Sequence, residues 1–223
     1  MSRSVWTLGM TGILVFASGA FAQNYTMDLT SVGDGANADG VYVSPYQGTI
    51  TGNGVNWSGY VICDDFTTES FLNTPWSATA TSAASVNSTV KFANVSYQGH
   101  SAQDDYNAVA WLANGLLQAS NVNSWTAQTN FSFAIWDIFD GASTDPSGGA
   151  TALITSAFNA VKGGYVGSNV AVFTPNPLSA SQEFLVVNPP IATPEPSSVA
   201  LLVIDLAVAL GLIFFLRRRS VQA

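Results

Sequence analysis

The chain has 223 residues and carries 14 Asp and Glu against 6 Lys and Arg, so its formal charge at pH 7 is −8. Between residues 23 and 190 the only basic residues are Lys91 and Lys162, which argues against a nucleic-acid partner because nucleic acids are bound mainly through basic side chains. Cys63 is the only cysteine, so an intramolecular disulfide is excluded.

The first residues have the layout of a secretory signal peptide. Arg3 precedes an apolar stretch from Val5 to Phe16, and an Ala-x-Ala site follows at residues 20–22. A charged start, a short apolar run and a small-residue site are typical of a cleaved leader. We expect residues 1–22 to be removed and the rest of the chain to be exported.

Residues 23–187 are expected to form one β-rich extracytoplasmic domain of the α+β class. Its first part contains short β-favouring runs at 41–43, 48–50, 55–57 and 60–63. Gly and Asn between these runs predict tight turns at 52–54 and 58–59. A further short strand is expected at 90–95.

A central group of about three helices follows these strands. Ser101 is a plausible N-cap for Asp104, and apolar residues then recur at helical spacing from Tyr106 to Leu117. Two more helical stretches are predicted at 127–139 and 149–161. The chain returns to strand character at 170–173 and 183–187, so strands flank a helical centre.

The C-terminal segment begins with a proline-rich linker at 188–198. The apolar run from Val199 to Leu216 has 18 residues and would reach about 27 Å as a helix, against a bilayer core of about 30 Å. It predicts one transmembrane helix, although Asp205 near its middle would cost about 2.5–3.5 kcal/mol on insertion. The arginine-rich tail 217–223 should stay cytoplasmic, which places the domain outside the membrane.

The tail resembles the PEP-CTERM sorting signal of Gram-negative bacteria that produce exopolysaccharide. The resemblance rests on the Pro194-Glu195-Pro196 triplet, the apolar run after it and the cluster Arg217, Arg218 and Arg219. It implies recognition by an exosortase, a membrane protease that cuts near the triplet. The protein would be held transiently in the inner membrane and then reach the cell envelope or the medium. Asp205 departs from the family pattern.

The segments around Cys63, residues 106–112 and residues 131–139 resemble the thioester domains of bacterial surface adhesins. That family joins a strand-end cysteine to a glutamine four residues before a tryptophan. With Trp136 as the tryptophan, Ser132 stands at the glutamine position, and Gln128 lies one helical turn earlier. Cys63 is therefore either a candidate reactive thiol or a small buried residue at a strand end.

Metal binding and catalysis have further candidates. Asp64, Asp65 and Glu69 could offer oxygen ligands to calcium, but such acids also serve in turns and caps. His100 could pair with Cys63 only if the fold brought them together, and no nucleophile-elbow or zinc-protease motif accompanies it. We expect no cofactor and no metal.

These observations predict an exported, non-enzymatic envelope or matrix protein that acts in adhesion, biofilm formation or exopolysaccharide association. Its expected partners are the membrane, an exosortase-type protease and an extracellular polysaccharide. One alternative is a covalent thioester adhesin that uses Cys63. Another is a carbohydrate-binding module in which Trp57, Trp76 or Trp125 stacks on sugar faces.

Overall fold

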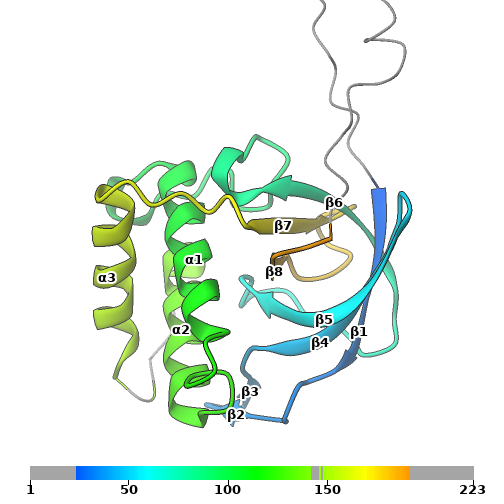
Figure 1. The fold of residues 1–223 in the computed structure, drawn as a ribbon, viewed down its shortest axis with the longest axis horizontal. Helices are drawn as coiled ribbons and strands as arrows, with labels where there is room; N and C mark the ends of the chain where they lie inside the picture. The colour runs from blue at the N-terminus through cyan, green and yellow to red at the C-terminus, as the bar shows by residue number, and fades with distance from the viewer. Residues whose placement is uncertain (1–23, 142–145, 147, 191–223) are drawn as a thin grey trace, which may run out of the picture. The chain divides into compact units, whose positions relative to one another are not determined.

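The computed structural model describes residues 24–141, 146 and 148–190. Within them the chain forms a closed antiparallel barrel with three α-helices packed beside it (Figure 1). The order around the barrel is β1 (Asn24–Ser31), β4 (Tyr46–Gly52), β5 (Val55–Cys63), β8 (Phe184–Val187), β7 (Val170–Pro175) and β6 (Trp76–Ser82). The helices are α1 (Ala102–Leu116), α2 (Trp125–Asp140) and α3 (Ala150–Lys162).

Short elements complete the domain. The strands β2 (Asn37–Ala38) and β3 (Val41–Tyr42) form a two-stranded ribbon between β1 and β4 in the chain. Two 3₁₀ turns, η1 (Ala83–Ser85) and η2 (Tyr97–Gly99), lie between β6 and α1 in the chain.

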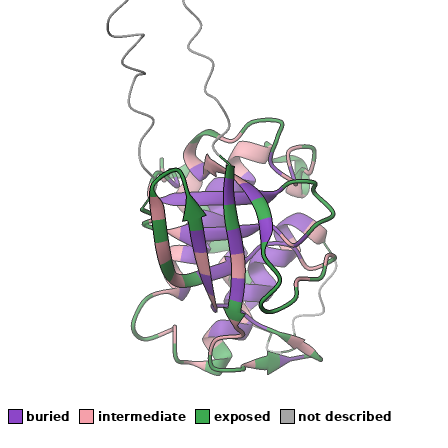
Figure 2. Ribbon diagram, turned by 90° about the vertical axis from the view of Figure 1, so that its right-hand side faces the viewer, coloured by how far each residue is buried: buried purple, intermediate pink, exposed green. Residues whose placement is uncertain are grey.

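The barrel interior is filled by side chains. Along β1 the buried residues Tyr25, Met27 and Leu29 alternate with more exposed ones, as a strand with one buried face requires. Figure 2 shows this alternation on the strands facing the viewer. Phe173 and Phe184 are also buried inside, and the Tyr25 and Phe173 rings meet edge to face at 5.5 Å. The barrel is therefore a packed core.

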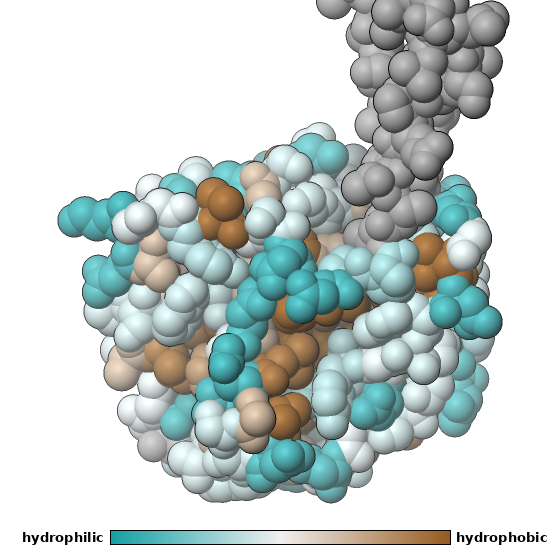
Figure 3. Space-filling view, viewed as in Figure 1, coloured by the Kyte–Doolittle hydropathy of each residue, from teal (hydrophilic) through white to brown (hydrophobic). Residues whose placement is uncertain are grey.

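A second core lies between the barrel and the helices. Ile62, Val172 and Leu185 point away from the barrel interior and pack in one cluster with α1 and α2. Since Phe173 and Phe184 fill the opposite face, β7 and β8 are buried on both sides. Figure 3 shows apolar side chains gathered in a band over this junction. The helices thus cover the wall formed by β5, β7 and β8.

The structure confirms the β-rich α+β domain and its three helices. Ser101 caps α1 by accepting a hydrogen bond from the Asp104 amide, as the sequence predicted. The turn at 52–54 is also confirmed, because it joins β4 to β5.

Two local predictions were wrong, and the strands β1, β2 and β6 were missed. β5 runs straight through 58–59, where Gly59 pairs with Gly48 and an added Cβ would lie 2.6 Å from the Trp57 ring. The glycine there permits close ring packing instead of a turn. Residues 90–95 form turns, in which Val90 and Phe92 are buried against the helices. Strand β6 lies in a Ser/Thr/Ala-rich stretch without a clear apolar alternation.

No helix among residues 24–141, 146 and 148–190 is long and apolar enough to cross a membrane. The expected signal peptide 1–22, the transmembrane helix 199–216, the tail 217–223 and the Pro-Glu-Pro triplet all lie outside the described residues.

Candidate functional site

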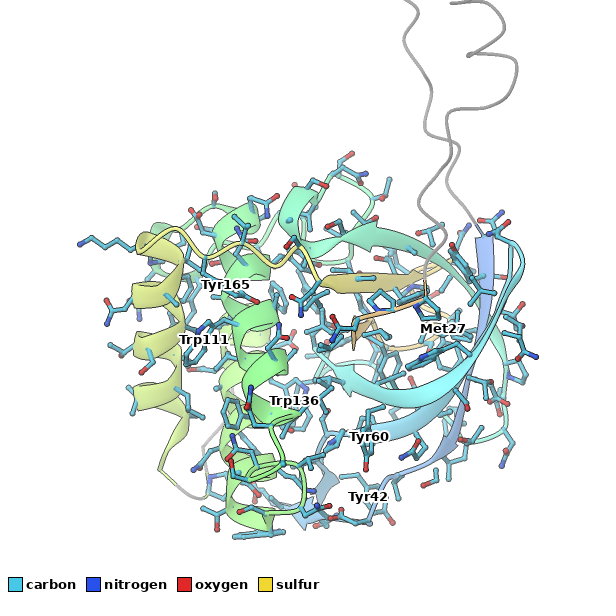
Figure 4. The ribbon with its side chains drawn as sticks, in the orientation of Figure 1. Met27, Tyr42, Tyr60, Trp111, Trp136 and Tyr165 are labelled. Atoms are coloured by element: carbon cyan, nitrogen blue, oxygen red, sulfur yellow. The ribbon has the colours of Figure 1, made fainter. Side chains whose placement is uncertain are left out.

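Cys63 ends β5 at the junction between the barrel and α2, and its neighbours include two residues singled out from the sequence. The Trp136 Nε1–H donates to the Cys63 carbonyl at 3.1 Å. Ser132 Oγ accepts from the Ser44 amide at 2.9 Å, and Ser44 Oγ accepts from the Cys63 amide at 3.0 Å. Figure 4 shows Trp136 between the helices and the barrel. The fold therefore brings Cys63, Ser132 and Trp136 together, with Ser44 as the link.

The Cys63 thiol is enclosed. Its exposed fraction is 0%, and its S–H donates to the Asp65 carbonyl at 3.1 Å. Burial, followed by the neighbouring Asp64 carboxyl, raises the pKa of the thiol well above its usual range. Since the thiolate is the reactive form, the folded domain holds Cys63 as a neutral, shielded thiol.

A glutamine that the sequence did not suggest shares a hydrogen-bond acceptor with Cys63. The Gln128 side chain forms its hydrogen bonds away from Cys63. Its Nε2 donates to Asp34 Oδ2 at 3.0 Å and to the Val122 carbonyl at 2.7 Å. Gln182 Nε2 instead donates at 2.6 Å to the same Asp65 carbonyl that the thiol uses. Only the pairing of β5 with β8 brings Gln182 to this place, so no local motif could have found it.

A buried carboxyl, Glu183, joins three parts of the chain beside Cys63. Its Oε1 accepts from the Tyr106 hydroxyl of α1 at 2.5 Å. Its Oε2 accepts from the Thr174 hydroxyl of β7 and from the Lys91 amide, the latter at 2.9 Å. Burial raises the pKa of this carboxyl, while these donors and the nearby lysine act in the opposite direction.

Two further acids flank Glu183. Asp65 is fully buried and forms an ion pair with the Lys91 ammonium. Asp64 is also fully buried, and neither of its carboxyl oxygens has a hydrogen-bond partner among the described residues. Burial, followed by the charges of Glu183 and Asp65, raises the pKa of Asp64 well above its usual range. Its buried surroundings therefore favour the neutral form of Asp64.

The other sequence candidates are placed apart or in structural roles. In the part of the chain that the structure describes, no three His, Cys, Asp or Glu side chains are arranged to hold a metal ion. Asp65 Oδ1 instead accepts from the Thr67 and Thr68 amides, as a turn residue does. The exposed His100 stacks on the Phe158 ring of α3 at 4.1 Å and hydrogen-bonds through its backbone to η2.

The surface carries a polar hollow of about 220 Å³ next to the start of α2. Its polar lining comes from Asp34, Gln47, Tyr60, Asn123 and Gln128, and Gly33, Pro45 and Val122 complete it. The Gln128 side chain is 1% exposed, and its Oε1 accepts no hydrogen bond from any described residue. An unpaired buried acceptor at the wall of a hollow can be satisfied by a ligand hydroxyl.

One exposed aromatic ring lines this hollow, and two more belong to residues close in the chain to its lining. Tyr60, which is 39% exposed, lines it, and Trp125, which is 51% exposed, follows Asn123 by two residues. Trp125 is fixed by an Nε1–H hydrogen bond of 3.0 Å to the Asn37 carbonyl. Tyr42 is 51% exposed and precedes Pro45, which lines the hollow, by three residues. We refer to Tyr42, Tyr60 and Trp125 as the aromatic rim.

The three tryptophans expected to stack on sugars differ in accessibility. Only Trp125 is well exposed, whereas Trp76 is buried in the barrel and Trp57 is half-buried against Gly59. The tyrosines of the rim were missed, because their outward direction depends on the strand register. The alternation of more and less exposed residues along β5 turns Tyr60 outward, and this pattern could have identified Tyr60 as a surface residue.

No protein-family model, no curated protein and no solved structure matches this chain. The geometry of its own residues therefore carries the functional inference.

We predict that Cys63 is protected in the folded domain. A thiol-alkylating reagent should react at least about 100-fold more slowly with the native protein than with the protein in urea, because reaction requires opening of the core. A Cys63→Ala, Ser58→Cys double variant carries its thiol at an exposed position of β5 and should react rapidly in both conditions. Equal rates for native and unfolded wild-type protein would contradict the structure.

Proposed function

We propose that this chain is an exported, non-enzymatic envelope or matrix protein that binds exopolysaccharide through the aromatic rim and its hollow. The main supporting observation is a polar hollow that is lined by the exposed Tyr60 ring and by Gln128, whose buried Oε1 has no hydrogen-bond partner among the described residues. Sugar rings present apolar C–H faces and hydroxyl groups at their edges. Aromatic rings stack on the former, and amides and carboxylates bind the latter.

The residues of the hollow suit these two kinds of contact. Tyr60 and Trp125 offer flat apolar surfaces, and Trp125 is already oriented by its bond to Asn37. Gln47 and Asn123 can donate and accept, and Asp34 can accept. Gly33, with φ of 67°, lets the backbone approach the Pro45 carbonyl, which an added Cβ would meet at 2.3 Å. Gly33 thereby sets the shape of the hollow.

The charge of the domain narrows the class of polysaccharide. Lys91 and Lys162 are the only basic residues between 23 and 190, and Lys91 is paired with Asp65. An acidic protein repels a polyanion at ordinary ionic strength. The proposed ligand is therefore a neutral polysaccharide rather than one rich in uronic acids or sulfate.

The proposed binding can be tested with Tyr60→Ala and Trp125→Ala. Each substitution should weaken binding to a neutral exopolysaccharide about tenfold, since one stacked ring contributes on the order of 1–2 kcal/mol. Affinity electrophoresis in gels containing the polysaccharide measures the change. Phe71→Ala is the matched control, because Phe71 is 64% exposed but belongs to the segment between β5 and β6. Equal retardation of all three variants would refute the proposed surface.

The sorting part of the proposal is supported by the sequence. Four segments occur in the order that an exosortase substrate requires. They are a leader at 1–22, the Pro194-Glu195-Pro196 triplet, the apolar run 199–216 and the arginine cluster 217–219. A span interrupted by Asp205 fits a temporary hold better than a permanent anchor. The domain would then be released outside the cytoplasm.

Glu195→Ala tests the sorting proposal in the producing cell. The wild-type protein should reach the envelope or medium without the arginine cluster, whereas the variant should stay in the membrane fraction at its unprocessed mass. Glu69→Ala removes an exposed acid of the domain and should be processed normally. Mature wild-type protein that still carries Arg219 would contradict the proposal, as would normal processing of Glu195→Ala.

A second candidate function is covalent capture through an internal thioester between Cys63 and Gln182. It is favoured by the shared acceptor, the Asp65 carbonyl, to which both side chains donate. Attack of the Cys63 sulfur on the Gln182 carboxamide would form the thioester and release ammonia. A thioester would also leave Cys63 unreactive toward the alkylating reagent in urea until methylamine opened it. Full alkylation in urea alone would exclude this candidate.

A further inference from the structure

We propose that Lys91 and Asp65 form an intramolecular isopeptide bond, an amide between the lysine Nζ and the aspartate Cγ. The two side chains are already in contact as an ion pair. Asp65 is fully buried, and the Lys91 side chain is 14% exposed. An enclosed amine and carboxyl held against each other are the two reactants of amide formation, brought together by the fold.

The two oxygens of the Asp65 carboxyl have different surroundings. Oδ1 accepts hydrogen bonds from the Thr67 amide at 3.1 Å, from the Thr68 amide at 3.0 Å and from the Thr67 hydroxyl at 3.3 Å. Oδ2 faces the Lys91 Nζ. Three donors on one oxygen form a site for the negative charge of a tetrahedral intermediate. Oδ1 is thus the oxygen that stays, and Oδ2 is the one that leaves.

The amine is positioned from both ends. Thr68 Oγ1 lies 2.5 Å from the Lys91 Nζ, and Glu183 Oε2 holds the Lys91 backbone amide at 2.9 Å. Glu183 is itself fixed by the Tyr106 and Thr174 hydroxyls. These bonds hold Lys91 over Asp65 in a site with little solvent access, where the product amide is protected from hydrolysis.

Asp64 supplies the group that moves protons. Its carboxyl is fully buried, has no hydrogen-bond partner among the described residues and stands next to Asp65 in the chain. Burial raises its pKa, so that it can act first as an acid. Asp140 adds a further carboxyl close enough to feel the charges of Asp65 and Lys91.

The reaction balances without an external reagent. The Lys91 ammonium first passes one proton to Asp65 Oδ2, which gives an amine and a carboxylic acid. The amine attacks Cγ, and the negative charge collects on Oδ1. The Asp64 acid then protonates the Oδ2 hydroxyl, which leaves as water, while Asp64 regains a proton from the new amide nitrogen. One ammonium and one carboxylate become one amide and one water.

The bond would join the segment after β5 to the loop before α1, across 26 residues. It would replace a buried ion pair, which is costly to desolvate, by a neutral amide. It would also restrict the unfolded chain as a disulfide does, in a protein whose single cysteine cannot form one internally.

Peptide mapping of the full chain tests the proposal. After denaturation and chymotryptic digestion, the wild-type protein should yield a branched peptide that joins the segments containing Asp65 and Lys91. Its mass should be about 18 Da, one water, below the sum of the two segments. Trypsin should cleave after Lys162 but not after Lys91, because the amide removes the lysine charge.

Matched variants separate the cross-link from other causes. Lys91→Arg keeps a cation beside Asp65 and should restore two separate peptides at full mass. Lys162→Arg and Cys63→Ala should both retain the deficit of about 18 Da, which distinguishes the amide from a thioester at Cys63. Asp64→Asn should leave much of the chain in the linear form. Separate wild-type peptides of full mass, with cleavage after Lys91, would overturn the proposal and leave only an ion pair.

Discussion

The hydrogen bonds of one buried carboxyl, Glu183, tie helix α1 to the barrel. Glu183 directly precedes β8, and its oxygens bind a tyrosine of α1, a threonine of β7 and the backbone of Lys91. Burying a carboxyl costs free energy, and hydrogen bonds to its oxygens offset that cost, so these donors stabilise Glu183 in the core. The position of the loop before α1, and with it the ion pair of Lys91 with Asp65, follows from this junction.

The elements of the fold could largely be read from the sequence, whereas their closure could not. Ser101 and the spacing of apolar residues predict helix α1. The glycines at 52–54 predict the turn there. The continuity of β5 depends on the Trp57 ring packing on Gly59, and β6 is held mainly by its partners β1 and β7. Such features are set by tertiary contacts, which override local turn and strand preferences.

The candidate sites divide in the same way. The sequence indicated the neighbourhood of Cys63 and Trp136, and the structure places them together. Gln182, Glu183 and Lys91 reach this neighbourhood only through strand pairing and a loop, so no spacing in the chain could link them to Cys63. Likewise, Tyr60 belongs to the proposed binding surface only because the β5 register turns it outward beside the start of α2. A closed barrel with exposed aromatic side chains beside a polar hollow is consistent with the proposed role in binding.

Tyr106→Phe tests most directly whether Glu183 and its donors join helix α1 to the barrel. This substitution removes one hydroxyl, which donates to Glu183 and accepts from the Phe92 amide, while keeping the aromatic ring. Urea unfolding should show a free energy of unfolding lower by about 1–3 kcal/mol, because Glu183 Oε1 and the Phe92 N–H both stay buried without the hydrogen bond that the hydroxyl made. Tyr60→Phe, at the surface, should change it by less than about 0.5 kcal/mol. An unchanged free energy of unfolding for Tyr106→Phe would contradict the account.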